Sequence, residues 1–184
     1  MMPLSEEELR KRTIGELKPL SGPVRIADSD PEWPRRFQRE AETIRSALGE
    51  RALRIEHVGS TAVPGLPAKP IIDIILVVAD SADEDSYVQA LEAAGYRLRI
   101  REPEWHEHRM FKGPQEDVHL HVYSRGCPEI DRVVLFRDRL RCNADDRELY
   151  ARTKHELARQ TWKYTQNYAD AKTAVIDEIL AKIR

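Results

Sequence analysis

The sequence predicts an α/β domain in which helices flank a β-sheet and a helical segment ends the chain. Residues 71–79 are almost wholly apolar, which is typical of a strand in the interior of a sheet. A helical pattern and further strand-like segments follow, and from Glu129 onward the pattern becomes helical. The 184 residues are enough to enclose one hydrophobic core without disulfides or structural metals.

The composition is that of a globular protein, with 41% hydrophobic and 34% charged residues and a formal net charge of −2. This charge gives no electrostatic reason to expect bulk nucleic-acid or membrane binding. Cys127 and Cys142 have neither zinc-site nor disulfide-framework spacing, so we interpret them as reduced thiols. The N-terminus has no apolar targeting segment, and no later apolar run approaches the roughly 20 residues that span a bilayer. We therefore expect a cytoplasmic protein.

A short N-terminal helix is expected where Ser5 and Glu8 have the spacing of a capping box, and it should end near Gly15. A stretch that contains proline and glycine follows and breaks the helical pattern. We therefore interpret residues 1–22 as an N-terminal extension and residues 23–184 as the domain.

The domain is expected to open with a short strand at residues 24–27, followed by a long amphipathic helix. Asp30 and Pro31 have the sequence of an N-cap followed by proline at the first helical position, and Gly49 closes the pattern. The apolar residues at helical spacing are Trp33, Phe37, Ala41, Ile44 and Leu48.

Strand-like segments occupy much of the middle of the chain, with one helix expected at residues 83–94 and closed by Gly95. The C-terminal part is expected to form three helices, with Asn143 as the N-cap of the second. Their apolar stripes are too short for a separate core, so we expect them to pack on the sheet. The expected strands are residues 52–58, 71–79, 96–100, 108–112 and 118–123.

The segment from His57 to Asp73 is the strongest candidate site. A strand that ends in Gly59–Ser60 lets the backbone approach a phosphate, because glycine has no side chain and the following N–H and hydroxyl groups can donate. Lys69 adds a positive charge. An ionised Asp73 in an interior strand is costly to bury unless it binds a metal or a fixed donor. Taken alone, Gly59–Ser60 is most simply a turn and Asp73 a capping carboxylate. Their occurrence together favours a phosphate and metal site.

His119 and His121 form a second candidate site. Residues two apart in a strand point to the same face, so both imidazoles can meet one metal ion or one phosphate. The alternative is a pair of histidines on a partly solvated face, since no cysteine or helical His-x-x-x-His spacing supports zinc.

Basic residues elsewhere in the chain can supply further phosphate contacts if they point inward. The alternative for each of them is a solvated charge or an ion-pair partner, because 30 Lys and Arg residues are balanced by 32 Asp and Glu residues. The candidates are Arg109, Lys112, Arg137, Lys154 and Lys172.

The stretch EHVGSTAVPGLPAKPIIDI resembles a motif of the GrpB family, whose fold belongs to the nucleotidyltransferase superfamily that includes DNA polymerase β. The resemblance extends from DPEWPRRF through HLHV and FRDRLR to YADAKTAVIDEIL, and leaves about the first 22 residues outside. It implies a nucleotidyltransferase-like mixed β-sheet with flanking helices and a C-terminal helical segment.

The resemblance also implies roles for individual residues. Asp73 matches the first of the superfamily's metal-binding carboxylates, whereas the position of the second is Ile75, and His119 and His121 stand where a later carboxylate is expected. We therefore expect Asp73, His119 and His121 to hold a divalent cation, Mg²⁺ or Mn²⁺, and to act in catalysis. The phosphate or nucleotide contacts expected from the motif are His57, Gly59, Ser60, Thr61 and Lys69.

The function implied by this resemblance is binding of a nucleoside triphosphate with a divalent cation and transfer of a nucleotidyl group to an unknown small-molecule acceptor. The alternative is a non-catalytic nucleotide-binding or folding-assistance module, like the GrpB domains fused to dephospho-CoA kinase. The missing carboxylates favour this alternative. Neither interpretation requires a membrane or bulk nucleic acid as partner.

Overall fold

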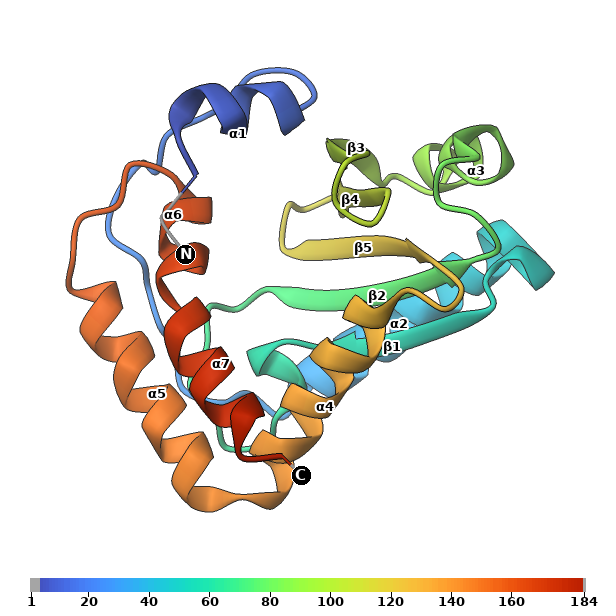
Figure 1. The fold of residues 1–184 in the computed structure, drawn as a ribbon. Coiled ribbons are helices and arrows are strands. Elements are labelled where there is room, and N and C mark those ends of the chain that lie inside the picture. Colours follow the sequence, from blue (N-terminus) through green and yellow to red (C-terminus); the bar gives the residue numbers. More distant parts are fainter. Residues whose placement is uncertain (1–3, 184) are drawn as a thin grey trace.

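The computed structural model describes residues 4–183 and contains a mixed five-stranded sheet (Figure 1). The central strands β2 and β5 are parallel, and every other neighbouring pair is antiparallel. The expected α/β fold class is thereby confirmed. In spatial order the strands are β1 (Arg54–Val58), β2 (Ile72–Val78), β5 (Val118–Ser124), β4 (His108–Lys112) and β3 (Arg97–Glu102).

Helices α2 (Glu32–Leu48) and α3 (Val88–Ala93) cover one face of the sheet. The carboxylate of Asp30 accepts a hydrogen bond from the backbone N–H of Glu32 at 2.8 Å, and Gly49 ends α2 with a φ of 57°. The expected helix at 83–94 is present as a 3₁₀ turn (Glu84–Ser86) followed by α3. The main core lies between these helices and the sheet, and includes Trp33, Ile44, Leu48, Ile74, Leu76, Leu91, Phe111, Leu120 and Val122.

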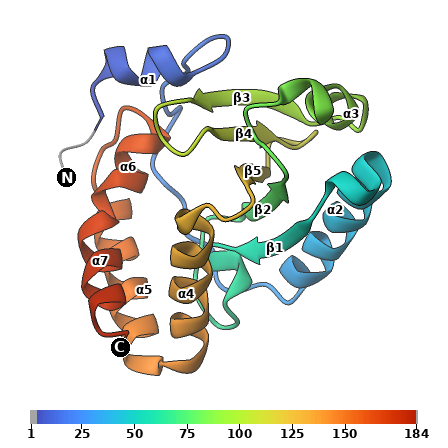
Figure 2. The same ribbon diagram turned by 45° about the vertical axis from the view of Figure 1, so that its right-hand side comes forward.

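The C-terminal helices cover part of the opposite face (Figures 1 and 2). Ile130 of α4 packs against Ile75 and Tyr123 of the sheet, and the later helices bury Val63 and Leu66 of the loop between β1 and β2. These helices therefore belong to the same folded unit as the sheet. They are α4 (Pro128–Cys142), α5 (Ala144–Ala158), α6 (Thr165–Ala171) and α7 (Thr173–Ala181).

The prediction of three C-terminal helices was wrong, because the last segment divides into α6 and α7 at Lys172. The break lets Tyr168 of α6 and Val175 of α7 both turn into the interior, where they are 2% and 7% exposed. The N-cap role of Asn143 is confirmed, since its side-chain oxygen accepts a hydrogen bond from Asp146 N–H at 2.9 Å.

The N-terminal residues pack along the outer strand of the sheet (Figure 2). Helix α1 (Glu6–Arg12) has the expected capping box between Ser5 and Glu8. The N–H of Ile14 donates to the carbonyl of Arg99 in β3 at 2.8 Å. The strand predicted at 24–27 was wrong, because only Ala27 finds a β-bridge partner there.

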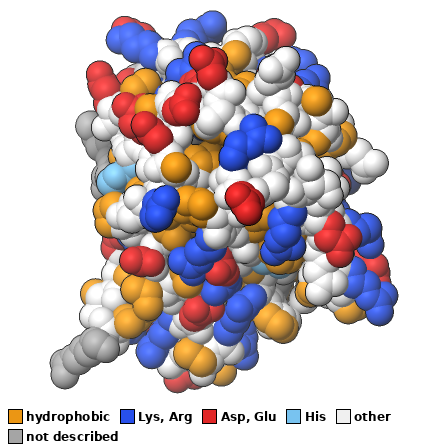
Figure 3. All heavy atoms as spheres, turned by 90° about the vertical axis from the view of Figure 1, so that its right-hand side faces the viewer, with side chains coloured by type: hydrophobic (Ala, Val, Ile, Leu, Met, Phe, Trp, Pro, Cys, Tyr) orange, Lys and Arg blue, Asp and Glu red, His pale blue; other side chains and the backbone are white. Residues whose placement is uncertain are grey.

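The surface carries both signs of charge. Figure 3 shows Lys and Arg side chains interspersed with Asp and Glu over one face, in agreement with the small formal net charge of −2. Among residues 4–183, no helix is both long and apolar enough to cross a membrane.

Candidate metal and phosphate site

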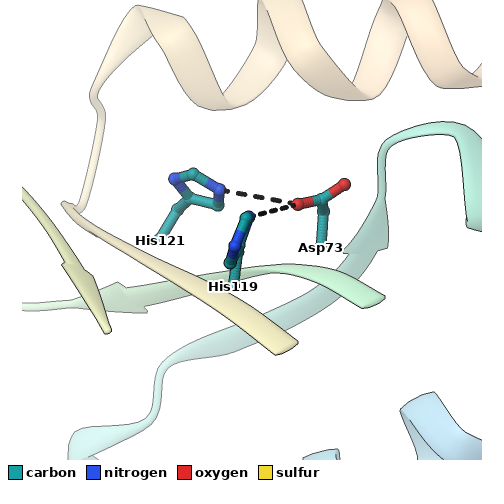
Figure 4. A group of neighbouring side chains, drawn as sticks. All are labelled: Asp73, His119 and His121. Atoms are coloured by element: carbon teal, nitrogen blue, oxygen red, sulfur yellow. Dashed lines mark ion pairs between the residues drawn. The ribbon is translucent and has the colours of Figure 1, made fainter. Parts of the chain in front are cut away.

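Asp73, His119 and His121 converge on the sheet face that also carries α4 (Figure 4). In the parallel β2–β5 pair Asp73 lies opposite His119, and His121 follows two residues later, so all three side chains point the same way. The Asp73 Oδ1 atom is 3.4 Å from Nδ1 of His119 and 3.9 Å from Nε2 of His121. These side chains are 31%, 19% and 28% exposed, so ligands can reach them from solvent.

The spacing of these three ligand atoms fits one divalent cation. All lie within 4.8 Å of one another, and four-coordinate bonds of about 2.1 Å place neighbouring ligand atoms about 3.4 Å apart. Burial opposes ionisation of Asp73, but interaction with the nearby His119 and His121 outweighs it and holds the Asp73 pKa well below its usual range. A carboxylate that stays ionised therefore lies beside two histidine side chains.

Gly59 brings the end of β1 directly against the Asp73 carboxylate. Its φ of +69° lies in the left-handed region, and a Cβ atom added there would lie 2.4 Å from Asp73 Oδ2. Any side chain at this position would collide with the carboxylate. Because the position is glycine, the chain can turn into the 3₁₀ segment Ser60–Ala62 immediately beside Asp73.

Lys154 of α5 is buried with its ammonium group beside Ser60. The Nζ atom donates to Ser60 Oγ at 3.0 Å and to the carbonyl of Pro67, and it lies 4.9 Å from the centre of the Tyr150 ring. Only 2% of Lys154 is exposed, and burial lowers its pKa from 10.5 to about 7. Within residues 4–183 no carboxylate lies within ion-pair distance of this ammonium group.

Lys69 and Lys172 add two more cations to the same region. Their Nζ atoms lie 6.0 Å and 4.8 Å from the centre of the Tyr168 ring. Burial lowers both pKa values, and repulsion from Lys172 lowers those of Lys69 and Lys154 further. In the described part of the chain neither Lys69 nor Lys172 forms an ion pair. Three half-buried or buried lysines without carboxylate partners leave positive charge for an anionic ligand to neutralise.

His57 faces the opposite side of the sheet from Asp73, and its contact with Thr61 stabilises the loop. His57 pairs in register with Ile74, which faces α2, and its ring stacks on Phe37 at 4.8 Å. Its Nε2 atom is 3.0 Å from the Thr61 hydroxyl, which donates to the carbonyl of Ile71 at 3.0 Å. Burial lowers the pKa of His57 to about 4, so the ring is neutral near pH 7. The structure therefore does not bring His57 to the face that carries Asp73, and it engages the Thr61 hydroxyl with His57 and the backbone.

The two arginines named as phosphate candidates are held by carboxylates. Arg109 lies on the α3 side of the sheet and its Nε atom donates to Glu84 at 2.5 Å. Arg137 of α4 donates to Glu56 at 2.7 Å and to the carbonyl of His57 at 2.9 Å, and so joins α4 to β1. These positions favour structural roles for both arginines.

Lys112, unlike Arg109, lies on the face of the sheet that carries Asp73. It lies directly opposite His119 in the β4–β5 pair, on the face that carries Asp73, and its Nζ atom is 3.3 Å from Glu116. Its side chain is 31% exposed, which places it at the edge of the candidate site.

Sequence reasoning did not identify Glu102 and His108, which extend the site away from Asp73. Nδ1 of His108 is 2.6 Å from a Glu102 carboxylate oxygen, and its Nε2 is 3.0 Å from Nδ1 of His121. Burial lowers the pKa of His108 to about 4, although Glu102 opposes the shift. The contact depends on the β4–β5 register, so the local sequence carries no signal for it.

A second metal-binding carboxylate is absent from the expected position. Ile75 is 1% exposed and packs against Ile130 of α4. The nearest acidic residue in the register of β1 is Glu56, which forms ion pairs with Arg137 at 2.7 Å and with Arg54 at 2.9 Å. Within the described residues, the metal-binding cluster therefore contains one carboxylate and two imidazoles.

Comparison with solved structures defines the class of fold. A crystal structure of the conserved protein GrpB from Enterococcus faecalis matches with a TM-score of 0.72 and 33% identity, over 86% of this chain and 98% of that chain. The Cid1 poly(U) polymerase bound to Mg 3′-dATP matches with a TM-score of 0.57 and 14% identity, over 79% of this chain and 49% of that chain. The second likeness shows the fold alone, which is nucleotidyltransferase-like.

Sequence comparison then shows the family. Residues 23–182 match the family described as GrpB protein, and the chain belongs to this family. A UPF0157 protein from Halalkalibacterium halodurans is 57% identical over 180 residues, covering 98% of this chain and 92% of that protein. A dephospho-CoA kinase from Mycolicibacterium paratuberculosis is 35% identical over 158 residues, covering 72% of this chain but only 39% of the kinase.

Proposed function

We propose that this protein binds a nucleoside triphosphate together with one divalent cation and transfers a nucleotidyl group to a small-molecule acceptor. The observation that carries the proposal is a set of three lysines without ion-pair partners among residues 4–183. Lys154 donates to Ser60 at 3.0 Å, and Lys69 and Lys172 lie close enough to Asp73 for its charge to oppose the lowering of their pKa values. Triphosphates are polyanions, and a glycine turn next to several buried cations is a suitable environment for them.

Different residues would bind the phosphate oxygens, neutralise their charge and hold the cation. Lys154 and Ser60 would donate to the phosphate oxygens, and Lys69 and Lys172 would neutralise the charge that develops on the leaving pyrophosphate. Asp73, His119 and His121 would hold the cation, which supplies positive charge to the phosphate oxygens when it is bound. The reaction breaks the bond between the α-phosphate and pyrophosphate, and joins the α-phosphate to an acceptor hydroxyl whose proton passes to water.

A second candidate function is a nucleotide-binding module without catalysis. The single carboxylate of the cluster favours it, since Ile75 occupies the position of the second carboxylate. The mycobacterial relatives named dephospho-CoA kinase also favour it, because the matching part is less than half of those proteins and could assist the rest.

Pyrophosphate release separates the two functions. The protein would be titrated with Mn²⁺ and each of the four ribonucleoside triphosphates, and binding would be followed by calorimetry. Pyrophosphate release would then be measured with a pool of small hydroxyl-bearing metabolites. Transfer requires both binding and release, whereas binding without release supports the module. Absence of nucleotide binding would refute both.

Lysine variants provide the matched control for this experiment. Lys154→Met removes one of the three clustered ammonium groups, whereas Lys18→Met removes the charge of an exposed lysine in the N-terminal region. Nucleotide affinity should fall at least tenfold in the first variant and stay unchanged in the second. Equal affinities would show that the lysine cluster does not bind phosphate.

A further inference from the structure

A chain of hydrogen-bonding groups runs across three neighbouring strands and ends at the candidate metal site. It begins at Glu102 of β3, continues through His108 of β4 and reaches His121 of β5. The distances are 2.6 Å from Glu102 Oε2 to His108 Nδ1, and 3.0 Å from His108 Nε2 to His121 Nδ1. The other nitrogen of His121, Nε2, is 3.9 Å from Asp73 Oδ1.

The Glu102 carboxylate determines which ring nitrogens of His108 and His121 carry a proton. An ionised carboxylate only accepts hydrogen bonds, so Nδ1 of His108 must carry the proton in the contact with Glu102. A neutral imidazole has one N–H group, so Nε2 of His108 is then an acceptor. Nδ1 of His121 must therefore donate to it, and in a neutral His121 this leaves a lone pair on Nε2 beside Asp73.

Packing holds the middle ring of this chain in place. The His108 side chain is 6% exposed, and its ring stacks on Tyr123 with centroids 4.8 Å apart. Trp105 meets the same ring edge-on at 5.4 Å. These ring contacts and the hydrogen bonds at its two nitrogens favour one orientation of His108 between Glu102 and His121.

We propose that Glu102 and His108 are positioning residues that hold His121 in the tautomer protonated at Nδ1, so that Nε2 presents its lone pair to the divalent cation. The role in metal binding rests on the proposed function, whereas the tautomer is a property of the metal-free protein. A proton on Nε2 would instead block the atom that faces Asp73. Groups behind a metal-binding histidine commonly fix the ligand in this way.

Nitrogen NMR of the metal-free protein tests the tautomer directly. Protein labelled with ¹⁵N-histidine would be measured at pH 8, and the exposed His155 of α5 serves as an internal reference for a ring without such partners. The expected result is a protonated Nδ1 and an unprotonated Nε2 for both His108 and His121. A proton on Nε2 of His121, or on both nitrogens of His108, would overturn the proposal.

Replacement of the middle ring tests the consequence for metal binding. His108→Phe keeps an aromatic ring against Tyr123 but removes the acceptor for His121, and His155→Phe is the matched control. Affinity for Mn²⁺ or Zn²⁺ should fall about 10- to 100-fold in His108→Phe and remain unchanged in the control. His121 should also show a mixture of tautomers in the first variant. Unchanged affinity together with unchanged His121 shifts would overturn the proposal.

The two measurements separate this inference from the proposed function. If the wild-type protein has the expected tautomers but binds no divalent cation, the proposed function fails and the hydrogen-bond assignment stands. If it binds the cation with Nε2 of His121 protonated before binding, the positioning role of Glu102 and His108 fails alone. If His108→Phe does not fold, the wild-type spectrum still decides the tautomer.

Discussion

Lys154→Met replaces a buried cation by an apolar side chain of similar length, at a position where the fold supplies two hydrogen-bond acceptors and no carboxylate among residues 4–183. Burial lowers the Lys154 pKa to about 7, below the value of 10.5 for an unperturbed lysine. The unfolded chain thus binds more protons than the folded protein between these two pH values. The protonated lysine destabilises the fold fully below about pH 7, and this cost disappears as the pH rises toward 10.5.

The magnitude follows from the separation of the two pKa values. At about 1.4 kcal/mol for each pH unit between them, the cost near neutral pH is on the order of 4 kcal/mol. Methionine loses the hydrogen bonds to Ser60 and Pro67, which offsets about 1 kcal/mol for each bond. The variant should therefore be more stable than wild type by about 2 kcal/mol at pH 7, and this advantage should shrink by about 2 kcal/mol at pH 9.

Urea unfolding at pH 7 and pH 9 measures this difference, with Lys18→Met as the exposed control. Affinity for pyrophosphate, measured by calorimetry at pH 7, should fall at least tenfold in Lys154→Met alone. A free-energy difference between Lys154→Met and wild type that is the same at both pH values would refute the assignment of a depressed pKa. A stabilised variant with unchanged pyrophosphate affinity would refute the role of Lys154 in binding.

Three further substitutions test the site and its surroundings. Gly59→Ala should destabilise the protein by about 2 kcal/mol or more in thermal melts, because a Cβ would lie 2.4 Å from Asp73 Oδ2 at a φ of +69°; wild-type stability would contradict the close approach of the Gly59 backbone to the Asp73 carboxylate. Asp73→Asn should lower Mn²⁺-dependent nucleotide affinity at least tenfold in titrations while the fold is retained, and unchanged affinity would remove Asp73 from the site. Arg109→Met should lower the free energy of unfolding by about 1 kcal/mol, because Glu84 loses one partner but keeps its two hydrogen bonds from Arg101; a loss of pyrophosphate affinity with unchanged stability would instead place Arg109 in the site.

The sequence predicted the elements of the fold better than their ends. The apolar run at 71–79 forms the central strand β2, because burial on both faces leaves a signal that local sequence carries. Residues 24–27 have a strand-like pattern but only one bridge partner, Ala68. The helix break at Lys172 contains no glycine or proline, so the local sequence did not predict it.

The sequence indicated the site where strand periodicity applied and where the Gly59–Ser60 turn is followed by Asp73 in an apolar strand. His119 and His121 share a face because they are two residues apart, and that was evident from the sequence. Their approach to Asp73 depends on the pairing of two strands that are distant in the chain. Lys154 was one of five basic candidates in the sequence, and it is separated from Ser60 by 94 residues. Only tertiary packing shows that it is buried beside Ser60.

The contact between Ile75 and helix α4 makes the single-carboxylate cluster difficult to reverse during evolution. A mutation from Ile75 to aspartate would place a carboxylate two residues from Asp73, but beneath Ile130 and closed off from water. An unpaired buried carboxylate costs several kcal/mol, which is a large part of the roughly 5 to 15 kcal/mol that holds a domain folded. An acid at position 75 would become favourable only if α4 moved away from the sheet at this point. The packing of α4 on Ile75 therefore limits this cluster to one acid as long as the helix keeps its present position.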